Sequence, residues 1–154
     1  MNYIYADHAA TTATSAAARK AMNDCMENYY GNPSSLHTPG QKAAEKLWEC
    51  RELMAKYLHA KPEEIYFTSG GSEADNQALL TAAMIGRKKG KKHIIYTAFE
   101  HHAVLHSLKR LEKEGFEVTL LPVHENGVVR LEDVKEAVSD DTVCVSLMYA
   151  NNEI

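Results

Sequence analysis

Three short polar segments of this chain have side chains suited to chemistry, and the first is residues 68–73, TSGGSE. An apolar run leads into two glycines, and Ser72 stands where a helix would begin, with Asp75 at the spacing of a capping box. Glycines permit close backbone approach, and the N–H groups of a helix start attract anions. Gly71 and Ser72 could therefore hold a phosphate, although a well-capped turn explains the segment equally well. The pattern is neither GxxxxGK[ST] nor GxGxxG.

The second segment is residues 100–104, EHHAV, which directly follow an apolar run. The imidazole of His101 could stack on a planar ligand or transfer protons near neutral pH. His102 and His106 have the i, i+4 spacing of a metal-binding pair on a helix, but a third ligand at a recognisable spacing and the HExxH motif are both missing. We therefore expect no metal site, and solvated or capping histidines explain these two positions.

The third segment is residues 149–153, YANNE, again after an apolar run. The side-chain amides of Asn151 and Asn152 could hydrogen-bond a ligand oxygen, although paired asparagines are also common in turns. The carboxyl ends of parallel strands meet at one edge of a sheet, where α/β proteins bind ligands. One shared site explains the three segments better than three coincidences do.

The elements that must position these segments alternate between helix and strand. We expect helices at 14–30, 41–59, 72–87, 103–113 and 131–138, and strands at 64–68, 93–97, 116–122 and 142–148. This order predicts an α/β fold whose mainly parallel sheet has helices on both faces.

The expected division of the chain is an N-terminal segment with helices at 1–60 and a partial α/β domain at 61–154. A parallel strand needs helices over both of its faces, and the chain stops soon after the strand at 142–148. We therefore expect a fragment of a longer fold, truncated after that strand.

Composition excludes several classes of protein. The 154 residues include 17 basic and 21 acidic side chains, a net charge of −4, which gives no electrostatic reason to expect nucleic acid or a membrane surface as a partner. The sequence has neither a spanning apolar run of about 20 residues nor the basic start of a signal peptide. We expect a cytoplasmic protein in which Cys25, Cys50 and Cys144 are reduced structural thiols.

Together these segments resemble the cysteine desulfurase family, within the fold-type I enzymes of class V aminotransferase type that depend on pyridoxal 5'-phosphate (PLP). The matching pieces keep their order through nearly the whole chain: YADHAATT at 5–12, GNPSS at 31–35, FTSGGSE at 67–73, EHHAVL at 100–105, GFEVT at 115–119 and VSLM…NNE at 145–153. The resemblance implies the N-terminal part of the large PLP-binding domain.

The resemblance also implies roles for single residues. Gly71 and Ser72 match the pair that binds the PLP phosphate. His101 matches the histidine that stacks on the pyridine ring and serves in proton transfer, and Asn152 matches the asparagine that hydrogen-bonds the phenolic oxygen. Ser72 replaces the more usual threonine, and His8 replaces a common asparagine near the substrate entrance, a change that concerns the substrate and not the cofactor.

The implied reaction converts L-cysteine to L-alanine and leaves a persulfide on the enzyme. A sulfur-acceptor protein then takes the sulfur for iron–sulfur cluster or thio-cofactor assembly, and the implied enzyme is a homodimer. A selenocysteine lyase, or another class V aminotransferase-like enzyme, would share the same cofactor-binding residues.

Several groups that the implied reaction needs have no counterpart in this sequence. They are the lysine that binds PLP covalently, the aspartate that pairs with the pyridine nitrogen and the cysteine that carries the persulfide. None of the twelve lysines has a matching context, and Cys144 lies within an expected strand. We therefore expect the chain to be inactive alone, and a non-catalytic truncated protein or binding partner is a further alternative.

Overall fold

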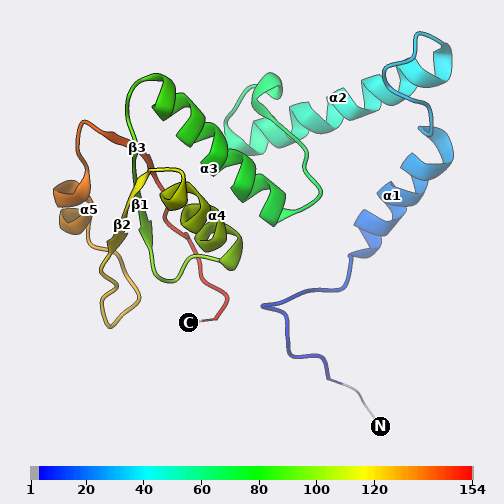
Figure 1. The fold of residues 1–154 in the computed structure, drawn as a ribbon. Helices are drawn as coiled ribbons and strands as arrows, with labels where there is room; N and C mark the ends of the chain where they lie inside the picture. The colour runs from blue at the N-terminus through cyan, green and yellow to red at the C-terminus, as the bar shows by residue number, and fades with distance from the viewer. Residues whose placement is uncertain (1–3, 154) are drawn as a thin grey trace. The chain divides into compact units, whose positions relative to one another are not determined.

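The computed structural model describes residues 4–153, which fold into two compact units at 4–67 and 68–153 (Figure 1). Each unit is described by itself. The domain boundary expected after residue 60 stays a prediction. Within the described residues, no helix is both long enough and apolar enough to cross a lipid bilayer.

The unit at 4–67 is built from helices α1 (Ala16–Asn28) and α2 (Thr38–Leu58) and the short 3-10 helix η1 (Pro62–Glu64). Side chains cap both α-helices, which explains where each begins: Ser15 Oγ accepts from the Ala18 N–H at 3.1 Å, and His37 Nδ1 accepts from the Gly40 N–H at 3.2 Å. These two helices confirm the ones expected at 14–30 and 41–59.

The strand expected at 64–68 is wrong. Residues 62–64 form η1, and residues 65–68 have no regular secondary structure. The Glu64 carboxylate accepts from the Lys61 N–H at 2.8 Å, and the Ile65 carbonyl accepts from the Arg51 guanidinium. The N–H groups of Glu64 and Ile65 bond locally to the Lys61 and Pro62 carbonyls, at 2.9 Å and 3.2 Å. An apolar run becomes a strand only where a neighbouring strand offers a ladder.

The unit at 68–153 contains a sheet of three parallel strands in the order β2-β1-β3. β1 (His93–Thr97) lies between β2 (Glu117–Leu121) and β3 (Thr142–Val145), and Ile95 pairs with Thr119 on one side and with Val145 on the other. Because β1 is central, four of its five residues are buried. The strand expected at 93–97 is confirmed, and those at 116–122 and 142–148 are confirmed in shorter form.

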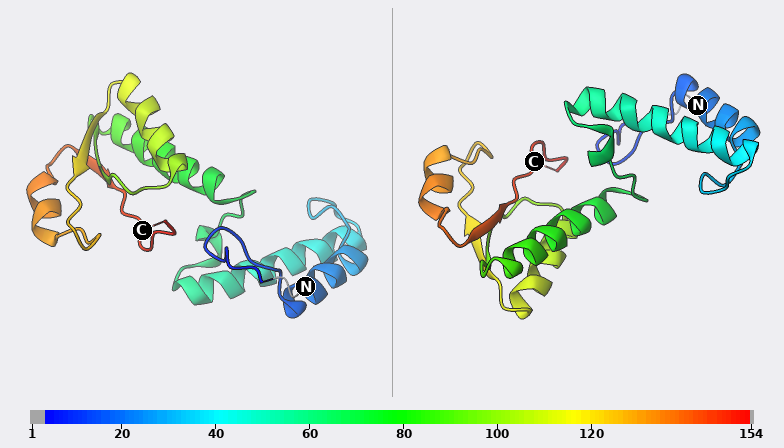
Figure 2. Two further views of the ribbon diagram at one scale, coloured as in Figure 1. Left: turned by 90° about the horizontal axis from the view of Figure 1, so that it is seen from below. Right: turned by 90° about the horizontal axis from the view of Figure 1, so that it is seen from above.

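Helices cover both faces of this sheet, which confirms the expected α/β architecture. α3 (Gly71–Lys88) and α4 (His102–Lys113) lie on one side, and α5 (Leu131–Ala137) lies on the other (Figures 1 and 2). Right-handed crossovers require this arrangement, since the chain steps from β1 to β2 and then returns past β1 to β3.

The core of this unit lies between the sheet and the helix pair α3 and α4. Its members are buried apolar side chains that recur at helical spacing on α3 and α4 or lie on or beside the strands: Leu79, Ala83, Ile94, Val104, Leu108, Leu111 and Phe116. Gly86 allows α3 to approach β3 closely, because a Cβ atom at this position would overlap the side chain of Val143. The strand order reverses at β1, so a crevice is expected outside the carboxyl ends of β1 and β3.

Candidate functional site

The connection from β1 to α4 begins with a buried polar turn. The Thr97 side chain is fully buried, and its hydroxyl donates to Glu100 Oε1 at 3.1 Å. The Glu100 N–H donates a hydrogen bond to the Thr97 carbonyl at 3.3 Å, so the chain turns sharply where β1 ends. Glu100 is buried at 8% exposure, which fixes the direction in which the next residue, His101, leaves the turn.

His101 is the N-cap of α4. Its Nδ1 accepts from the Ala103 N–H at 3.1 Å, and the residue itself is exposed. An imidazole nitrogen that accepts a hydrogen bond carries no proton, so the proton of the neutral ring is on Nε2. The cap therefore fixes the tautomer of His101 and leaves Nε2 as its donor.

A crevice of about 360 Å³ lies where the strand order places it, between the β1–α4 connection and the segment after β3. Both His101 and Asn152 line it. Asn151 Oδ1 accepts from the Glu153 N–H at 2.6 Å, which forms a tight turn with Asn152 at its centre.

The two walls of this crevice are joined by direct hydrogen bonds. The Met148 N–H donates to Glu100 Oε1 at 2.7 Å, and Asn151 Nδ2 donates to the Phe99 carbonyl at 2.7 Å. Sequence reasoning assigned no role to Glu100, and it considered Asn151 only as a possible ligand contact, not as a link between the walls. Each stands directly before an assigned residue, and an acid at the end of an apolar strand was the signal that could have revealed Glu100.

A second cavity, of about 410 Å³, lies between the starts of α3 and α4 and is lined by both Ser72 and His101. A polar chain holds the two helices together here. Asn76 Nδ2 donates to the Ser72 carbonyl at 2.6 Å, and the buried Ser107 hydroxyl lies 2.6 Å from Asn76 Oδ1 and 2.9 Å from the Ala103 carbonyl. His101 thus borders one cavity with Ser72 and another with Asn152.

The capping box expected from Ser72 and Asp75 at the start of α3 is wrong. Glu73 closes the turn instead, since its Oε2 accepts from the Ser69 hydroxyl at 2.7 Å and from the Ser69 N–H at 2.6 Å. These two hydrogen bonds lower the pKa of Glu73. Because α3 begins at Gly71 with Gly70 as its N-cap, Ser72 lies inside the helix, and Asp75 does not stand at the capping-box position.

Gly71 is the first residue of α3. A Cβ atom built there would meet nothing within 4 Å, so the first turn of the helix is open to a ligand. Gly71 lines neither cavity at His101, but it directly precedes Ser72, which lines the cavity between the starts of α3 and α4.

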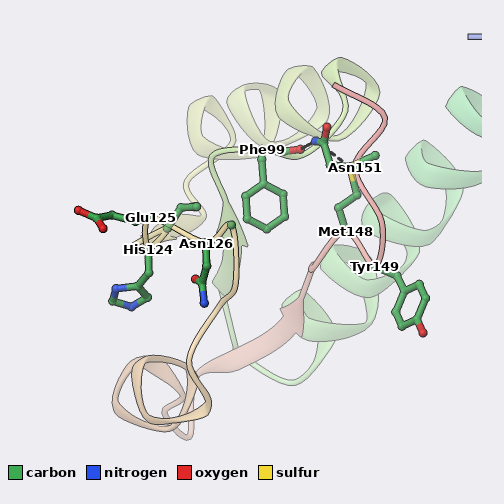
Figure 3. Close-up of a pocket in the computed structure, with 9 residues that line it drawn as sticks. Phe99, His124, Glu125, Asn126, Met148, Tyr149 and Asn151 are labelled. Carbon is green, nitrogen blue, oxygen red and sulfur yellow. Dashed lines mark hydrogen bonds between the residues drawn. The ribbon is translucent and has the colours of Figure 1, made fainter. Parts of the chain in front are cut away.

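The larger cavity next to the crevice contains none of the residues assigned from the sequence. It encloses about 480 Å³ between the loop after β2 and the segment after β3 (Figure 3). Figure 3 shows Asn151 turned toward Phe99, whereas Tyr149 points away into solvent. His124, which lines this cavity, is paired with Asp133, and its Nε2 lies 2.8 Å from Asp133 Oδ2. We therefore place the candidate site at His101.

Two further groups of chemical interest in this unit are the His102 and His106 pair on α4 and the Cys144 thiol in β3. The His102 and His106 rings lie 5.8 Å apart, and residues 4–153 contain no group of three or more His, Cys, Asp or Glu side chains that could hold a metal ion. Burial raises the pKa of the Cys144 thiol, so less of it is thiolate at neutral pH.

The N-terminal motif lies in the other unit, and its polar groups contact one another. The Tyr5 hydroxyl donates to the Asp7 carbonyl at 3.0 Å, and the Tyr5 and His8 rings meet edge to face at 5.2 Å. His8 is exposed.

Comparisons with known proteins agree with the fold. Residues 4–154 match the model of the family described as "Aminotransferase class-V". A protein named cysteine desulfurase IscS, from Clostridium botulinum, is 50% identical over 151 residues, which are 98% of this chain and 38% of that protein. The chain therefore spans well under half the length of this curated relative.

Two solved structures are close in both fold and sequence. A "NIFS-like protein" superposes with a TM-score of 0.90 at 41% identity, over 96% of this chain and 40% of that one. A structure titled "SspA in complex with cysteine" superposes with a TM-score of 0.89 at 34% identity, over 96% of this chain and 42% of that one.

Proposed function

The chain belongs to the aminotransferase class-V family, and on that premise we propose that it forms one wall of the PLP site of a cysteine desulfurase. The observation that carries the proposal is the position of His101. It borders one cavity with Ser72 and a second with Asn152, so each of the other two groups assigned to the ligand shares a cavity with this one side chain.

The residues present fit PLP at this place. The open first turn of α3 offers N–H groups at Gly71 and Ser72, and the Ser72 hydroxyl adds a further donor, which together suit a phosphate dianion. His101 offers a ring face for stacking, and the Asn152 amide offers a donor for the phenolic oxygen. The bound coenzyme would supply an electron sink.

Each residue has a distinct task in this proposal. Ser72 and Gly71 hold and orient the phosphate, and Asn152 fixes the rotation of the ring. The His101 ring covers one face of the coenzyme and excludes water from it. Because Nδ1 of His101 is held by the Ala103 N–H, Nε2 is the atom that holds or moves a proton.

The substrate, partners and location also belong to the proposal. The relatives named as cysteine desulfurases and the structure titled as a cysteine complex favour L-cysteine, converted to L-alanine with transfer of sulfur through an enzyme persulfide. A sulfur-acceptor protein of scaffold type, a homodimer and a cytoplasmic location follow from the same resemblance. A selenocysteine lyase, another class V enzyme and a non-catalytic binding protein are the alternatives.

Ligand pairs test the phosphate contact directly. Pyridoxal lacks the phosphate of PLP, so we predict that the chain binds PLP more tightly than pyridoxal. Ser72→Ala should weaken PLP binding by about tenfold, because one hydrogen bond to a charged group is lost, and should leave the affinity for pyridoxal unchanged. Titration calorimetry measures both affinities. Ser34→Ala, at an exposed serine of the other unit, is the matched control.

Two results would count against this assignment. If the unsubstituted chain binds neither ligand, the proposed function is wrong. If it binds PLP and pyridoxal equally well, the cofactor phosphate is not held at the start of α3.

A further inference from the structure

We propose that Glu100 and Asn151 are positioning residues that hold His101 and Asn152 on opposite walls of one crevice. The inference rests on the proposed function and extends it to two side chains to which neither the sequence motifs nor the comparisons assign a positioning role. Neither residue need touch the ligand, because both act through the residue that follows them in the chain.

The first observation is the burial of the Glu100 carboxylate. A carboxylate at 8% exposure is costly unless hydrogen bonds compensate for the lost water. Here Oε1 accepts from the Thr97 hydroxyl at 3.1 Å and from the Met148 N–H at 2.7 Å. One bond is local to the turn, and the other reaches a segment 48 residues away.

The second observation is the reciprocal hydrogen bond from the opposite wall. Asn151 Nδ2 donates to the Phe99 carbonyl at 2.7 Å, while its Oδ1 accepts from the Glu153 N–H at 2.6 Å. One wall thus contributes a carboxylate and a carbonyl as acceptors, and the other contributes a backbone N–H and an amide as donors. We call the Glu100–Met148 and Asn151–Phe99 hydrogen bonds the double clamp.

The third observation is the place of the clamp in the fold. It joins the chain just after β1 to the chain just after β3, beyond the hydrogen bond from the Ser146 N–H to the Ile95 carbonyl at 2.8 Å, which extends the ladder one residue past β3. Without it the two segments could separate, and His101 and Asn152 would no longer border one crevice of fixed width. A ligand that binds both side chains would then have to order the walls itself, which reduces affinity.

The experiment compares Glu100→Ala, Glu100→Gln and Asn151→Asp in the full chain. The glutamine oxygen can still accept from the Met148 N–H, so Glu100→Gln should retain the clamp that Glu100→Ala loses. Asn151→Asp keeps the acceptor for the Glu153 N–H and removes the donor to Phe99. Glu136→Ala, at an exposed glutamate of α5, is the matched control.

The first readout is amide hydrogen exchange at Met148 without ligand. We expect exchange to quicken by about tenfold in Glu100→Ala, because one hydrogen bond protects this amide, and to remain near the starting rate in Glu100→Gln and Glu136→Ala. Equal exchange in Glu100→Ala and the unsubstituted chain would overturn the clamp itself.

The second readout is ligand affinity at a temperature at which all variants are folded by circular dichroism. We expect Glu100→Ala and Asn151→Asp to bind PLP and pyridoxal about five- to tenfold more weakly, with the ratio of the two affinities unchanged, since the phosphate contact at Ser72 is intact. Glu100→Gln should restore both affinities. The double variant Glu100→Ala, Asn151→Asp should lose less binding free energy than the two single variants lose together, because both hydrogen bonds hold the same two walls.

The outcomes separate the two hypotheses. If the unsubstituted chain binds PLP and Glu100→Ala binds it equally well, the positioning role is wrong and the proposed function stands. If Glu100→Ala changes the ratio of PLP to pyridoxal affinity, Glu100 acts through general loss of structure, and the inference is also wrong. If the unsubstituted chain binds neither ligand, the proposed function and the cofactor role of the clamp fail together, whatever the exchange rate at Met148 shows.

Discussion

At the scale of the residue, His101 has a structural task, the N-cap of α4, and in our proposal a chemical task as well. Its Nδ1 caps α4, and its ring borders both cavities of the candidate site. The two tasks use different parts of the imidazole, since the cap needs one lone pair while stacking needs the ring face. They can therefore be separated by substitution.

We predict that His101→Asn keeps the stability of α4 but weakens binding of PLP and pyridoxal alike, because asparagine is a good N-cap and has no ring. His101→Ala should also lose about 1 kcal/mol of helix stability through loss of the cap acceptor. Thermal melts followed by circular dichroism and calorimetric titrations measure the two effects.

Equal ligand binding by His101→Asn and the unsubstituted chain would show that the ring makes no contact with the ligand. Ser15→Ala, which removes the N-cap of α1 in the other unit, is the control for cap loss away from the cavities.

At the scale of the element, the amino ends of the three strands are fixed by a single histidine. The side chain of His93 in β1 is buried, and its Nδ1 and Nε2 lie 2.8 Å from Thr142 Oγ1 in β3 and 2.8 Å from Thr119 Oγ1 in β2, respectively. Thr142 Oγ1 also accepts from the Ser139 N–H, so its own proton can point to His93 Nδ1. The sheet is therefore joined across all three strands by side chains as well as by its ladder.

We predict that His93→Leu destabilises the sheet by about 1–3 kcal/mol, because the half-buried hydroxyls of Thr119 and Thr142 lose their hydrogen bonds to the imidazole. Hydrogen exchange of the Ile94 and Ile95 amides measures the change in opening free energy. His106→Leu, at an exposed histidine of α4, is the control and should change little.

The triple variant His93→Leu, Thr119→Val, Thr142→Val gives a stricter comparison. Replacing all partners of a polar network by apolar groups is often nearly neutral. The Ser139 N–H also loses Thr142 as its acceptor, but Ser139 is exposed and water can take that place. Stability should therefore largely return in the triple variant, and if it stays as low as in His93→Leu, lost packing and not lost hydrogen bonding is the cause.

At the scale of the whole molecule, the position of the lysines decides what the chain can do alone. All twelve lysines lie within the described residues, and none lines either cavity at His101. The structure therefore offers no amine that could bond to an aldehyde held there. Cys25 and Cys50 lie on α1 and α2 in the unit at 4–67, and Cys144 lies within β3.

We predict that the 154-residue chain, given PLP and L-cysteine, releases no sulfide above the rate with PLP alone. Borohydride treatment of the PLP-loaded chain should leave no single lysine stoichiometrically modified in peptide mass maps. Colorimetric sulfide detection and mass spectrometry check the two statements. One fully modified lysine, or catalytic sulfide release, would contradict this prediction.

The sequence by itself determined the parallel α/β fold and the order of its elements. Apolar β-branched runs, glycines and capping residues are local signals, and Ile94, Ile95 and the helix at 102–113 carry them strongly. It also predicted that the segments at 100–104 and 149–153 lie close together, because polar residues that follow parallel strands meet at one edge of the sheet, and His101 and Asn152 do line one crevice. The assigned roles of Gly71, Ser72, His101 and Asn152 stay predictions.

Only the tertiary structure decided which side chains hold those segments together. The run at 64–68 looks like a strand locally, but the Ile65 carbonyl accepts from the Arg51 side chain and the Glu64 and Ile65 N–H groups bond within the preceding 3-10 turn, not to a neighbouring strand. The hydrogen bond between Glu100 and Met148 joins residues 48 positions apart, and no local pattern encodes such a pairing. Propensity acts over a few residues, whereas a buried carboxylate finds its donor only after the strands have fixed their neighbours.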